Sequence, residues 1–318
     1  KQKKAIIPFR GPINSQSLSC AEDLKYKLIN NDKYGFKNNN NDYVKKINSI
    51  LLGDSYAEGI CEKSNNDIAG HLRKNKITTI NLGITGTGPL ISLAVLKEFG
   101  NKLKPQNVIY LYFEGNDLDD LNWEKKDNNL MRYLNKEYTV DYVDKINQIK
   151  LFLDEAALES EIIINSQVSN KRVSEIIEKK RTELFKEHLK DILELSNLKN
   201  IIKFNLFKKQ NKAYDLELFY SIIERMNFET NQLNAKYIFV YVPTWSRYFT
   251  KYTKEISKTN LKDEILENIK NRNITTVDLT EFFDNSNDIK KYFPLGFVGH
   301  YNSIGYKKIA EIISKNVN

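Results

Sequence analysis

Several residue types are scarce in this chain of 318 residues, and each scarcity excludes a class of protein. There are only two cysteines, Cys20 and Cys61, which are too few for a cysteine zinc site or an iron–sulfur cluster. No run of residues approaches the roughly 18 apolar residues that a membrane-spanning helix requires. Zinc-finger spacings and RNA-binding signatures are also missing. We therefore expect a soluble globular protein whose chemistry needs no metal and no cofactor.

An excess of one charge sign is present but modest. The chain has 49 Lys and Arg against 41 Asp and Glu, which gives a formal net charge of +8. A basic protein can bind nucleic acid, an anionic membrane surface or an acidic glycan. Because acidic residues are interspersed with basic ones along the whole length, we expect no nucleic-acid partner and interpret the charge as a solvated basic surface.

The two cysteines can form one disulfide. Cys20 lies in an irregular segment, residues 1–43, which is punctuated by prolines, glycines and a polar run of asparagines. A bridge to Cys61 would fasten this segment to the rest of the chain and would indicate an oxidising, extracytoplasmic compartment. Two buried free thiols are the alternative. The chain begins at Lys1 rather than methionine, from which we expect a signal peptide or membrane anchor to precede it.

Glycine is scarce and unevenly placed, with thirteen in the chain and none between Gly115 and Gly296. Outside residues 123–214 and the N-terminal segment, apolar β-branched runs alternate with helical patterns, which predicts a doubly wound α/β domain made of residues 44–122 and 215–318. Residues 123–214 are rich in Lys, Glu, Leu and Ile and lack Gly and Pro, which predicts a helical insertion acting as a lid or cap. Strands are expected at residues 47–52, 77–80, 107–113, 235–242 and 274–277, and helices at 68–72, 89–103, 256–271 and 302–315.

The loops after the predicted strands hold residues suited to acyl transfer. Ser55 lies at a sharp turn between a strand and a helix, where a serine presents its Oγ outward. A serine nucleophile needs a base, and His300 lies in the loop after the last strand, on the same edge of the sheet. His71, in the first helix, and His188, in the insertion, are interpreted as ordinary surface or core histidines.

The oxyanion that develops in acyl transfer needs preorganised hydrogen-bond donors. The Gly86 N–H, after the second strand, and the Asn116 side-chain amide, after the third, are suited to this role. A plain turn residue is the alternative for Asn116, because Asn often follows Gly in turns. The combination of all four residues is more specific than any one of them.

The order Ser55, Gly86, Asn116 and His300 resembles the SGNH/GDSL hydrolase family, which is named after these residue types. The resemblance implies a flavodoxin-like three-layer α/β/α fold with a mainly parallel five-stranded sheet. It also implies that Ser55 attacks an ester carbonyl, that His300 is the base, and that Ser55, Gly86 and Asn116 form the oxyanion hole. Neighbouring phrases are similar to a bacterial subgroup associated with export and with acyl esters of glycans or the cell envelope. The similarity extends over roughly residues 44–122 and 235–318.

The sequence departs from this family in one place. The aspartate that usually precedes the histidine by three residues, and orients its ring, is replaced by Phe297. We expect His300 to be oriented by a backbone carbonyl instead. The alternative is that Asp284 or Asp288 reaches the ring from upstream.

The predicted function is that of an extracytoplasmic serine esterase or deacylase, which an anchor upstream of residue 1 would tether to a membrane. Its substrate would be an O-acyl or O-acetyl ester of a glycan or envelope component, or a small ester, cleaved through an acyl-serine. Two alternatives stay open: an acyltransferase that passes the acyl group to a polysaccharide, and a glycan-binding module of weak activity, which Phe297 favours. Substrate contacts are expected after the fourth strand, from Trp245, Arg247 and Tyr248.

Overall fold

The computed structural model describes residues 9–10, 12–20, 22–151, 153–155, 214–249, 261–296 and 299–317. The chain divides into two compact units, residues 1–150 with 215–318, and residues 151–214. Most of the second unit lies outside the described residues, so the insertion predicted over residues 123–214 is described only in its first part and at residue 214. None of the described helices is both long enough and apolar enough to cross a membrane.

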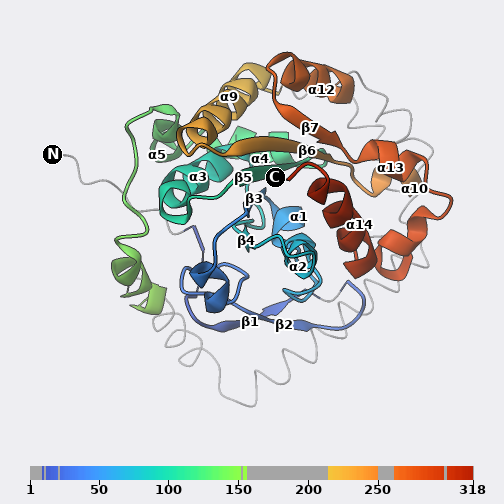
Figure 1. The fold of residues 1–318 in the computed structure, drawn as a ribbon, viewed down its shortest axis with the longest axis horizontal. Helices are drawn as coiled ribbons and strands as arrows, with labels where there is room; N and C mark the ends of the chain where they lie inside the picture. The colour runs from blue at the N-terminus through green and yellow to red at the C-terminus, as the bar shows by residue number, and fades with distance from the viewer. Residues whose placement is uncertain are drawn as a thin grey trace, which may run out of the picture. The chain divides into compact units, whose positions relative to one another are not determined.

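A five-stranded parallel sheet forms the centre of this unit (Figure 1). The strand order is β4-β3-β5-β6-β7, which is the flavodoxin-like order, and each neighbouring pair is parallel. The predicted fold class is therefore confirmed. The strands are β3 (Ser49–Gly53), β4 (Thr79–Asn81), β5 (Asn107–Phe113), β6 (Lys236–Val242) and β7 (Thr275–Asp278).

The central strands read as nearly continuous apolar runs because helices cover both of their faces. All seven residues of β5 are buried, and so are all residues of β6 except its first. At the end of β3 the chain passes unusually close to β5: a Cβ at Gly53 would lie 2.7 Å from the Leu111 carbonyl oxygen, and Gly53 has a φ of +135°. Only glycine fits this position, which sets the chain direction at the start of the next helix.

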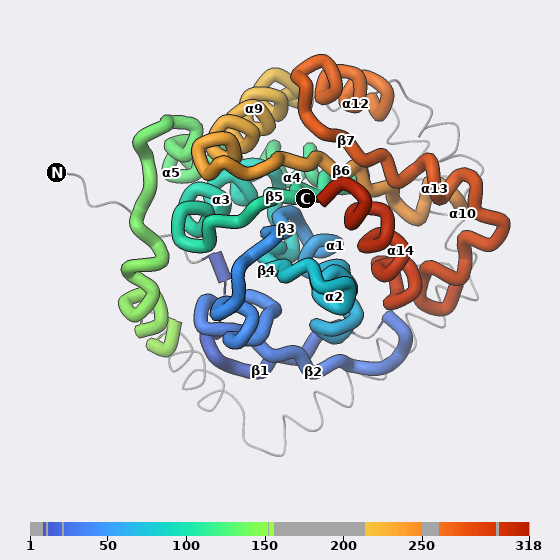
Figure 2. The backbone as a smooth tube through the Cα atoms, viewed as in Figure 1, coloured from blue at the N-terminus to red at the C-terminus, as the bar shows by residue number. Residues whose placement is uncertain are grey.

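Helices cover the two faces of the sheet, which confirms the predicted three layers (Figures 1 and 2). Helices α3 (Pro89–Leu103) and α9 (Leu216–Gln232) pack on one face, with α12 (Leu261–Asn271) beside α9. Helices α1 (Ser55–Glu58), α2 (Ile68–Lys74) and α14 (Ser303–Ser314) cover the other. Shorter helices fill the connections: α4 (Asp117–Glu124), α5 (Asn128–Met131), α10 (Ser246–Phe249), α13 (Thr280–Asp284), and the 3-10 helices η1 (Asn40–Val44), η2 (Arg132–Leu134), η3 (Ile289–Tyr292) and η4 (Pro294–Gly296).

The N-terminal segment, predicted as irregular, contains a small antiparallel hairpin of β1 (Gln16–Ser19) and β2 (Lys27–Asn30), followed by η1. A disulfide joins Cys20, directly after β1, to Cys61, just beyond α1, with 4.8 Å between the two Cα atoms. The predicted pairing of the two cysteines is thus confirmed. Arg10, earlier in the same segment, forms an ion pair with Glu58 of α1. The segment is therefore fastened at two points, Glu58 and Cys61, at the end of the short helix that begins with Ser55.

Candidate active site

Ser55 lies at the carboxyl edge of the sheet, at the first position of α1. Asp54 caps this helix: its carboxylate accepts a hydrogen bond from the Tyr56 N–H at 2.9 Å. The Ser55 N–H belongs to the first turn of α1, where N–H groups have no partner within the helix. The local sequence thus presents both the Oγ and an N–H of Ser55 at the point where β3 ends.

His300 lies beside Ser55, in the loop that leads into α14. Its Nε2 is 2.8 Å from the Ser55 Oγ, and the ring packs against Tyr56 with 4.6 Å between ring centroids. Tyr56 is in turn stacked on Phe113 at the end of β5. The structure therefore brings together the two residues that the sequence predicts as nucleophile and base, and packs the histidine against aromatic rings.

The group that orients His300 is Glu22, from the loop between β1 and β2. The His300 Nδ1 lies 2.8 Å from Glu22 Oε1, and the His300 backbone N–H donates to Glu22 Oε2, also at 2.8 Å. Figure 2 shows this N-terminal stretch, in blue, beside the red segment that precedes α14. The expectation of orientation by a backbone carbonyl was wrong, because a carboxylate occupies the Nδ1 side of the ring.

Asp284 and Asp288, the alternative acids, do not take this place. Both are exposed, Asp284 at the end of α13 and Asp288 just before η3. Phe297, which stands at the family's usual aspartate position, lies outside the described residues. The next residue that matters is Gly299, where a Cβ would lie 2.4 Å from Glu22 Oε2 and φ is +90°. A glycine here lets the Glu22 carboxylate reach the His300 N–H.

This arrangement favours one tautomer of the His300 ring. A carboxylate facing Nδ1 favours the tautomer in which Nδ1–H donates to Glu22, and that leaves the lone pair of Nε2 directed at the Ser55 hydroxyl. Ser55 Oγ, the His300 ring and the Glu22 carboxylate thus form one continuous hydrogen-bonded chain. Such a chain can withdraw the hydroxyl proton while the serine oxygen attacks an electrophile, and can stabilise the imidazolium that results.

Gly86 lies in the loop after β4, next to the Ser55 loop. The Ile84 N–H donates to the Gly53 carbonyl at 2.9 Å, which brings the two loops together. Thr85 donates to Glu58 Oε2 through its N–H at 2.9 Å and through its hydroxyl at 2.6 Å. Gly86 itself is exposed, and no heavy atom would lie within 4 Å of a Cβ placed on it. Its N–H is thus on an open turn that α1 fixes through Glu58.

Asn116 is the third predicted oxyanion donor and lies directly after β5, at the start of α4. Its side-chain Nδ2 donates to Asp120 Oδ2 at 2.8 Å. An amide nitrogen carries two hydrogens, so one stays available for a second acceptor. The Asn116 Oδ1 is buried and has no hydrogen-bond partner among the described residues. Asp120 therefore fixes the amide from one side.

Buried carboxyl groups lie beneath this edge of the sheet. Burial raises the pKa of Asp54 to about 6, against hydrogen bonding and the nearby His300, which lower it. Burial also raises the pKa of Asp117, and the charge of Asp54 acts in the same direction. The Tyr110 hydroxyl donates to Asp117 Oδ2 at 2.8 Å. A pKa of about 6 leaves Asp54 largely ionised at neutral pH, whereas the upward shift at Asp117 favours the uncharged form of that carboxyl group.

The loop after β6 holds the predicted substrate residues. Arg247 is nearly buried and donates through Nε to Glu114 Oε1 at 2.8 Å, so its guanidinium is engaged within the protein. Glu114 also accepts from the Tyr241 hydroxyl at 2.7 Å. Trp245 and Tyr248 are partly buried against the core under α14. A contact of these three residues with substrate stays a prediction, and for Arg247 the ion pair indicates a role in fixing the loop.

The remaining histidines lie elsewhere. The His71 ring is mostly buried in α2, its Nε2 is 3.4 Å from the Ser303 hydroxyl, and burial lowers its pKa. His188 lies outside the described residues. In the part of the chain that the structure describes, one group of potential ligands is close enough to hold a metal, namely Cys20, Glu22 and Cys61. The disulfide removes both thiols from that group, and Glu22 is bound to His300.

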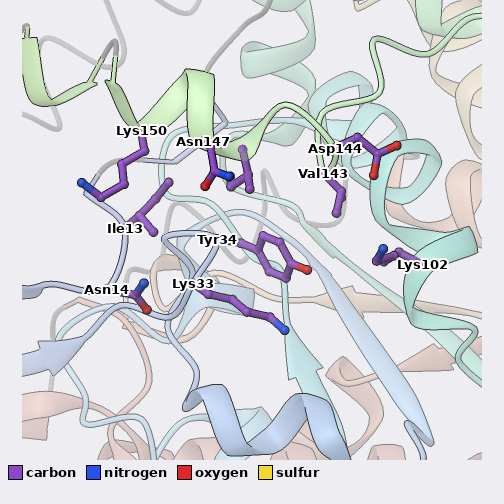
Figure 3. A pocket seen from close by; sticks show the side chains of 10 residues that line it. Ile13, Asn14, Lys33, Tyr34, Lys102, Val143, Asp144, Asn147 and Lys150 are labelled. Atoms are coloured by element: carbon purple, nitrogen blue, oxygen red, sulfur yellow. The ribbon is translucent and has the colours of Figure 1, made fainter.

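Two clefts in the surface lie at different distances from the site: one borders Glu22, and the other is lined by none of the site residues. A cleft of about 210 Å³ borders the Glu22 side of the site and is lined among others by Glu22, Cys61, Phe293 and Asn302. Another, of about 290 Å³, contains none of the residues discussed above; Figure 3 shows the side chains that line it, including Tyr34, Lys33, Lys102 and Asp144. Ser55 is buried and is not among the residues that line either of these two clefts.

Glu22 is the functional residue that the sequence interpretation missed. One signal could have found it: Glu22 is two residues from Cys20, and Cys61 is six residues from Ser55. If the disulfide is assumed, these spacings place the Glu22 carboxylate near the Ser55 loop. No pattern of hydrophobic residues points to it.

No family model and no curated protein matches this chain. Solved structures do match. A protein of the G-D-S-L lipolytic family from Desulfitobacterium hafniense is 14% identical, with 84% of this chain and 98% of that chain covered and a TM-score of 0.43. A lipase/acylhydrolase from Enterococcus faecalis is 12% identical, with 85% and 95% covered and a TM-score of 0.43. A two-domain esterase active on acetylated mannans is 11% identical, with 87% and 50% covered and a TM-score of 0.38.

The first of these neighbours is described as a member of the G-D-S-L family, which is the family that the sequence resembles. At such low identity the likeness is one of chain path and does not extend to the chemistry of a site. The class that fold and site define together is a flavodoxin-like α/β protein with a serine, a histidine and a glutamate in one hydrogen-bonded chain.

Proposed function

We propose that this protein is a serine esterase or deacylase that cleaves carboxylic esters through an acyl-serine intermediate. The observation that carries the proposal is the chain of hydrogen bonds from Glu22 through His300 to Ser55, with 2.8 Å at each step. A nucleophile, a base within reach of it and an acid that orients the base are the parts this chemistry requires. They meet at the edge of a parallel sheet where such sites occur.

In the proposed reaction, the Ser55 oxygen attacks the ester carbonyl while His300 Nε2 takes the hydroxyl proton. The tetrahedral oxyanion is held by the N–H groups of Ser55 and Gly86 and by the amide of Asn116. His300 then protonates the leaving alcohol, which leaves the acyl group on Ser55. Water, deprotonated by the same nitrogen, releases the acid and restores the serine. Glu22 stabilises the imidazolium in both halves of the reaction.

We further propose an extracytoplasmic protein that acts on O-acyl esters of a glycan or envelope component. Two observations support this. The Cys20–Cys61 disulfide is suited to an oxidising compartment, and the phrases around the Gly86 and Asn116 loops are similar to a subgroup associated with such esters. The alternative of a binding module without turnover was motivated by Phe297, and Glu22 removes that motive because it supplies the missing carboxylate.

The test begins with intact-mass measurement after treatment with a fluorophosphonate probe. One label per chain is expected in the native protein and none in Ser55→Ala, because that change deletes the nucleophile with which the probe reacts. The same two proteins are then assayed on acetylated oligosaccharides and on p-nitrophenyl esters of increasing acyl length. Turnover that survives in Ser55→Ala would show that the nucleophile is elsewhere.

A second measurement separates hydrolysis from transfer. The native protein is incubated with an acyl ester donor and an unacylated oligosaccharide acceptor, and both released acid and acylated acceptor are quantified by mass spectrometry. An esterase releases free acid at a rate that the acceptor does not change. A product dominated by acylated acceptor would favour the acyltransferase, which uses the same acyl-serine.

A further inference from the structure

We propose that the Cys20–Cys61 disulfide is a positioning element of the active site, which holds Glu22 against His300, so that turnover depends on the bridge being intact. The proposal rests on the proposed function and extends it to the control of the same site. The family's usual acid lies three residues before the histidine, on the same loop. Glu22 instead lies 278 residues before His300, on a separate hairpin, so the family pattern does not lead to this proposal.

The covalent path between nucleophile and acid is short. Glu22 is two residues from Cys20, in the loop that joins β1 to β2, and Cys61 lies two residues beyond Gly59, the residue that ends the helix of Ser55. The bridge therefore connects the loop that carries the carboxylate to the turn next to the nucleophile. Along the chain, without the bridge, Glu22 and Ser55 are 33 positions apart.

The hairpin that carries Glu22 buries little apolar surface of its own. Four of its large apolar side chains are mostly exposed to solvent, namely Leu18 by 66%, Leu24 by 76%, Tyr26 by 71% and Leu28 by 57%, and Ile29, at 6%, is the buried one. An isolated two-stranded hairpin is marginally stable at best in water, and here the hydrophobic effect adds little to hold it in place. The position of Glu22 must therefore come from specific attachments.

Few such attachments lie near Glu22. The Cys61 N–H donates to the Ser19 hydroxyl at 2.9 Å, and the Ser303 N–H donates to Glu62, the residue after Cys61, at 3.1 Å. The hydrogen bonds of Glu22 to His300 are themselves part of the site. The disulfide is the covalent member of this set, and it restricts the freedom of the loop most strongly.

The geometry leaves little tolerance for movement. Glu22 Oε2 is so close to Gly299 that a Cβ there would lie at 2.4 Å, and both carboxylate oxygens are committed to His300. A displacement on the order of 1 Å can lower the rate of an enzymatic reaction on the order of a hundredfold. Loss of the orienting acid from a serine protease lowers kcat by about ten-thousandfold, which sets the upper limit for the effect.

The chemical step is reduction by a dithiol. A dithiol gives two electrons and two protons to the S–S bond, which leaves Cys20 and Cys61 as thiols and converts the dithiol to its cyclic disulfide. Ser55, His300 and the oxyanion donors are unchanged by this reaction. Glu22 is then released to leave the imidazole, which loses its fixed tautomer.

The experiment measures kcat and KM for an ester substrate before and after dithiothreitol, in the native protein and in Glu22→Gln. Thiol titration counts the sulfhydryl groups, and circular dichroism follows the fold. Reduction is expected to lower kcat of the native protein at least tenfold with KM within twofold. In Glu22→Gln, whose orienting carboxylate is already gone, reduction is expected to change kcat by less than twofold. The double variant Cys20→Ala with Cys61→Ala should match the reduced protein.

Three results would overturn the proposal. One is a reduced protein that keeps kcat within twofold while two thiols are titrated. Another is an equal loss on reduction in Glu22→Gln, which would mean that the bridge acts without Glu22. The third is loss of the circular dichroism spectrum on reduction and in the double variant, which would make the bridge a determinant of the fold instead of the Glu22 position.

A spectroscopic readout separates this proposal from the proposed function. The Nδ1–H of His300, donated to a carboxylate, should give a far-downfield proton resonance that is absent in His300→Gln. That resonance is expected to disappear on reduction and in Glu22→Gln, even if no ester is ever turned over. Probe labelling and turnover that fail while the resonance responds would reject the esterase and leave the positioning role intact. A resonance that survives reduction would reject the positioning role.

Discussion

Two regions contribute to the site in different ways: the loops at the carboxyl edge of the sheet, and the N-terminal segment. The loops supply Ser55, Gly86, Asn116 and His300, each fixed by the strand or helix it adjoins. The N-terminal segment supplies Glu22, and also Arg10, whose ion pair with Glu58 adjoins the Thr85 loop. The first region follows from a common α/β topology. The second depends on attachments particular to this chain, so it can be separated from the first by experiment.

The largest expected effect distinguishes the histidine at the carboxyl edge from the histidine in the helix layer. His300→Gln should lower kcat by about a thousandfold or more, because it removes the proposed base, whose ring contacts the Ser55 Oγ. His71→Gln, in α2, should change kcat by less than about threefold, since its ring contacts Ser303 rather than the nucleophile. Steady-state kinetics on one ester substrate compares them, and equal losses in both variants would reject His300 as the base.

The next effect tests the N-terminal segment directly. Glu22→Gln should lower kcat by about a hundredfold to ten-thousandfold with little change in KM, because the amide cannot fix the same tautomer of His300. Asp284→Asn and Asp288→Asn are matched controls of the same type and should stay within about threefold, since both carboxylates are exposed. A loss of kcat in either control as large as that in Glu22→Gln would indicate that Asp284 or Asp288 orients His300.

A smaller effect on kcat is expected from Arg10, which the N-terminal segment places against Glu58 and not against His300. Arg10→Met removes the partner of Glu58, which in turn binds the Thr85 N–H and hydroxyl next to Gly86. We expect kcat to fall about threefold to tenfold with KM within twofold, because a donor of the oxyanion hole becomes less well placed. Lys25→Met, an exposed residue of the same segment, is the control. An unchanged kcat in Arg10→Met would confine the contribution of the segment to Glu22.

The smallest expected effect is on the pH dependence of the free energy of unfolding, and it arises from Glu124, which contacts a loop at the carboxyl edge of the sheet. Burial raises the pKa of Glu124 to about 7, against N–H donors from Gly88 and Leu90 that lower it. The pKa of Glu124 is higher in the folded state than in the unfolded state. The stabilisation of the folded state that follows from this difference is therefore fully present below about pH 4.5 and is lost as the pH rises through about 7. The free energy of unfolding should therefore fall across this range by at most about 3 kcal/mol from this group.

Denaturant titrations at pH 5, 6, 7 and 8 measure this dependence. The native protein should show a steeper decline than Glu124→Gln, which carries no titrating group at this position. Asp54 and Asp117 act in the same direction and should leave a residual slope in the variant. Identical slopes in both proteins would contradict the raised pKa of Glu124.

The sequence predicts the carboxyl-edge loops well because their cause is local. The apolar run of β5, the glycine that ends β3 and the order of strands and helices follow from patterns within a few turns of each residue. Ser55 and His300 could then be placed on one edge from topology alone. That their Oγ and Nε2 meet at 2.8 Å is a structural finding.

Glu22 could not be predicted in this way, because its contact with His300 spans 278 residues and no periodic pattern marks it. Its hairpin exposes Leu18 and Leu28, so hydrophobic alternation gives no indication of which side faces the protein. Asp284 and Asp288 were chosen for closeness in sequence, which is a poor guide when a distant segment folds back. The disulfide was the informative constraint, and its use as a distance restraint would have brought Glu22 to the Ser55 loop.

The separation of Glu22 from His300 also orders events during synthesis. During translation Glu22 is made first and Ser55 next. His300 follows 245 residues after Ser55. An unfinished chain can therefore hold a nucleophile and an acid but no base. The complete set exists only when α14, which begins at Ser303, is available to pack on the sheet. Ester cleavage by the proposed mechanism would thus begin only after His300 and α14 have been synthesised and have packed on the sheet.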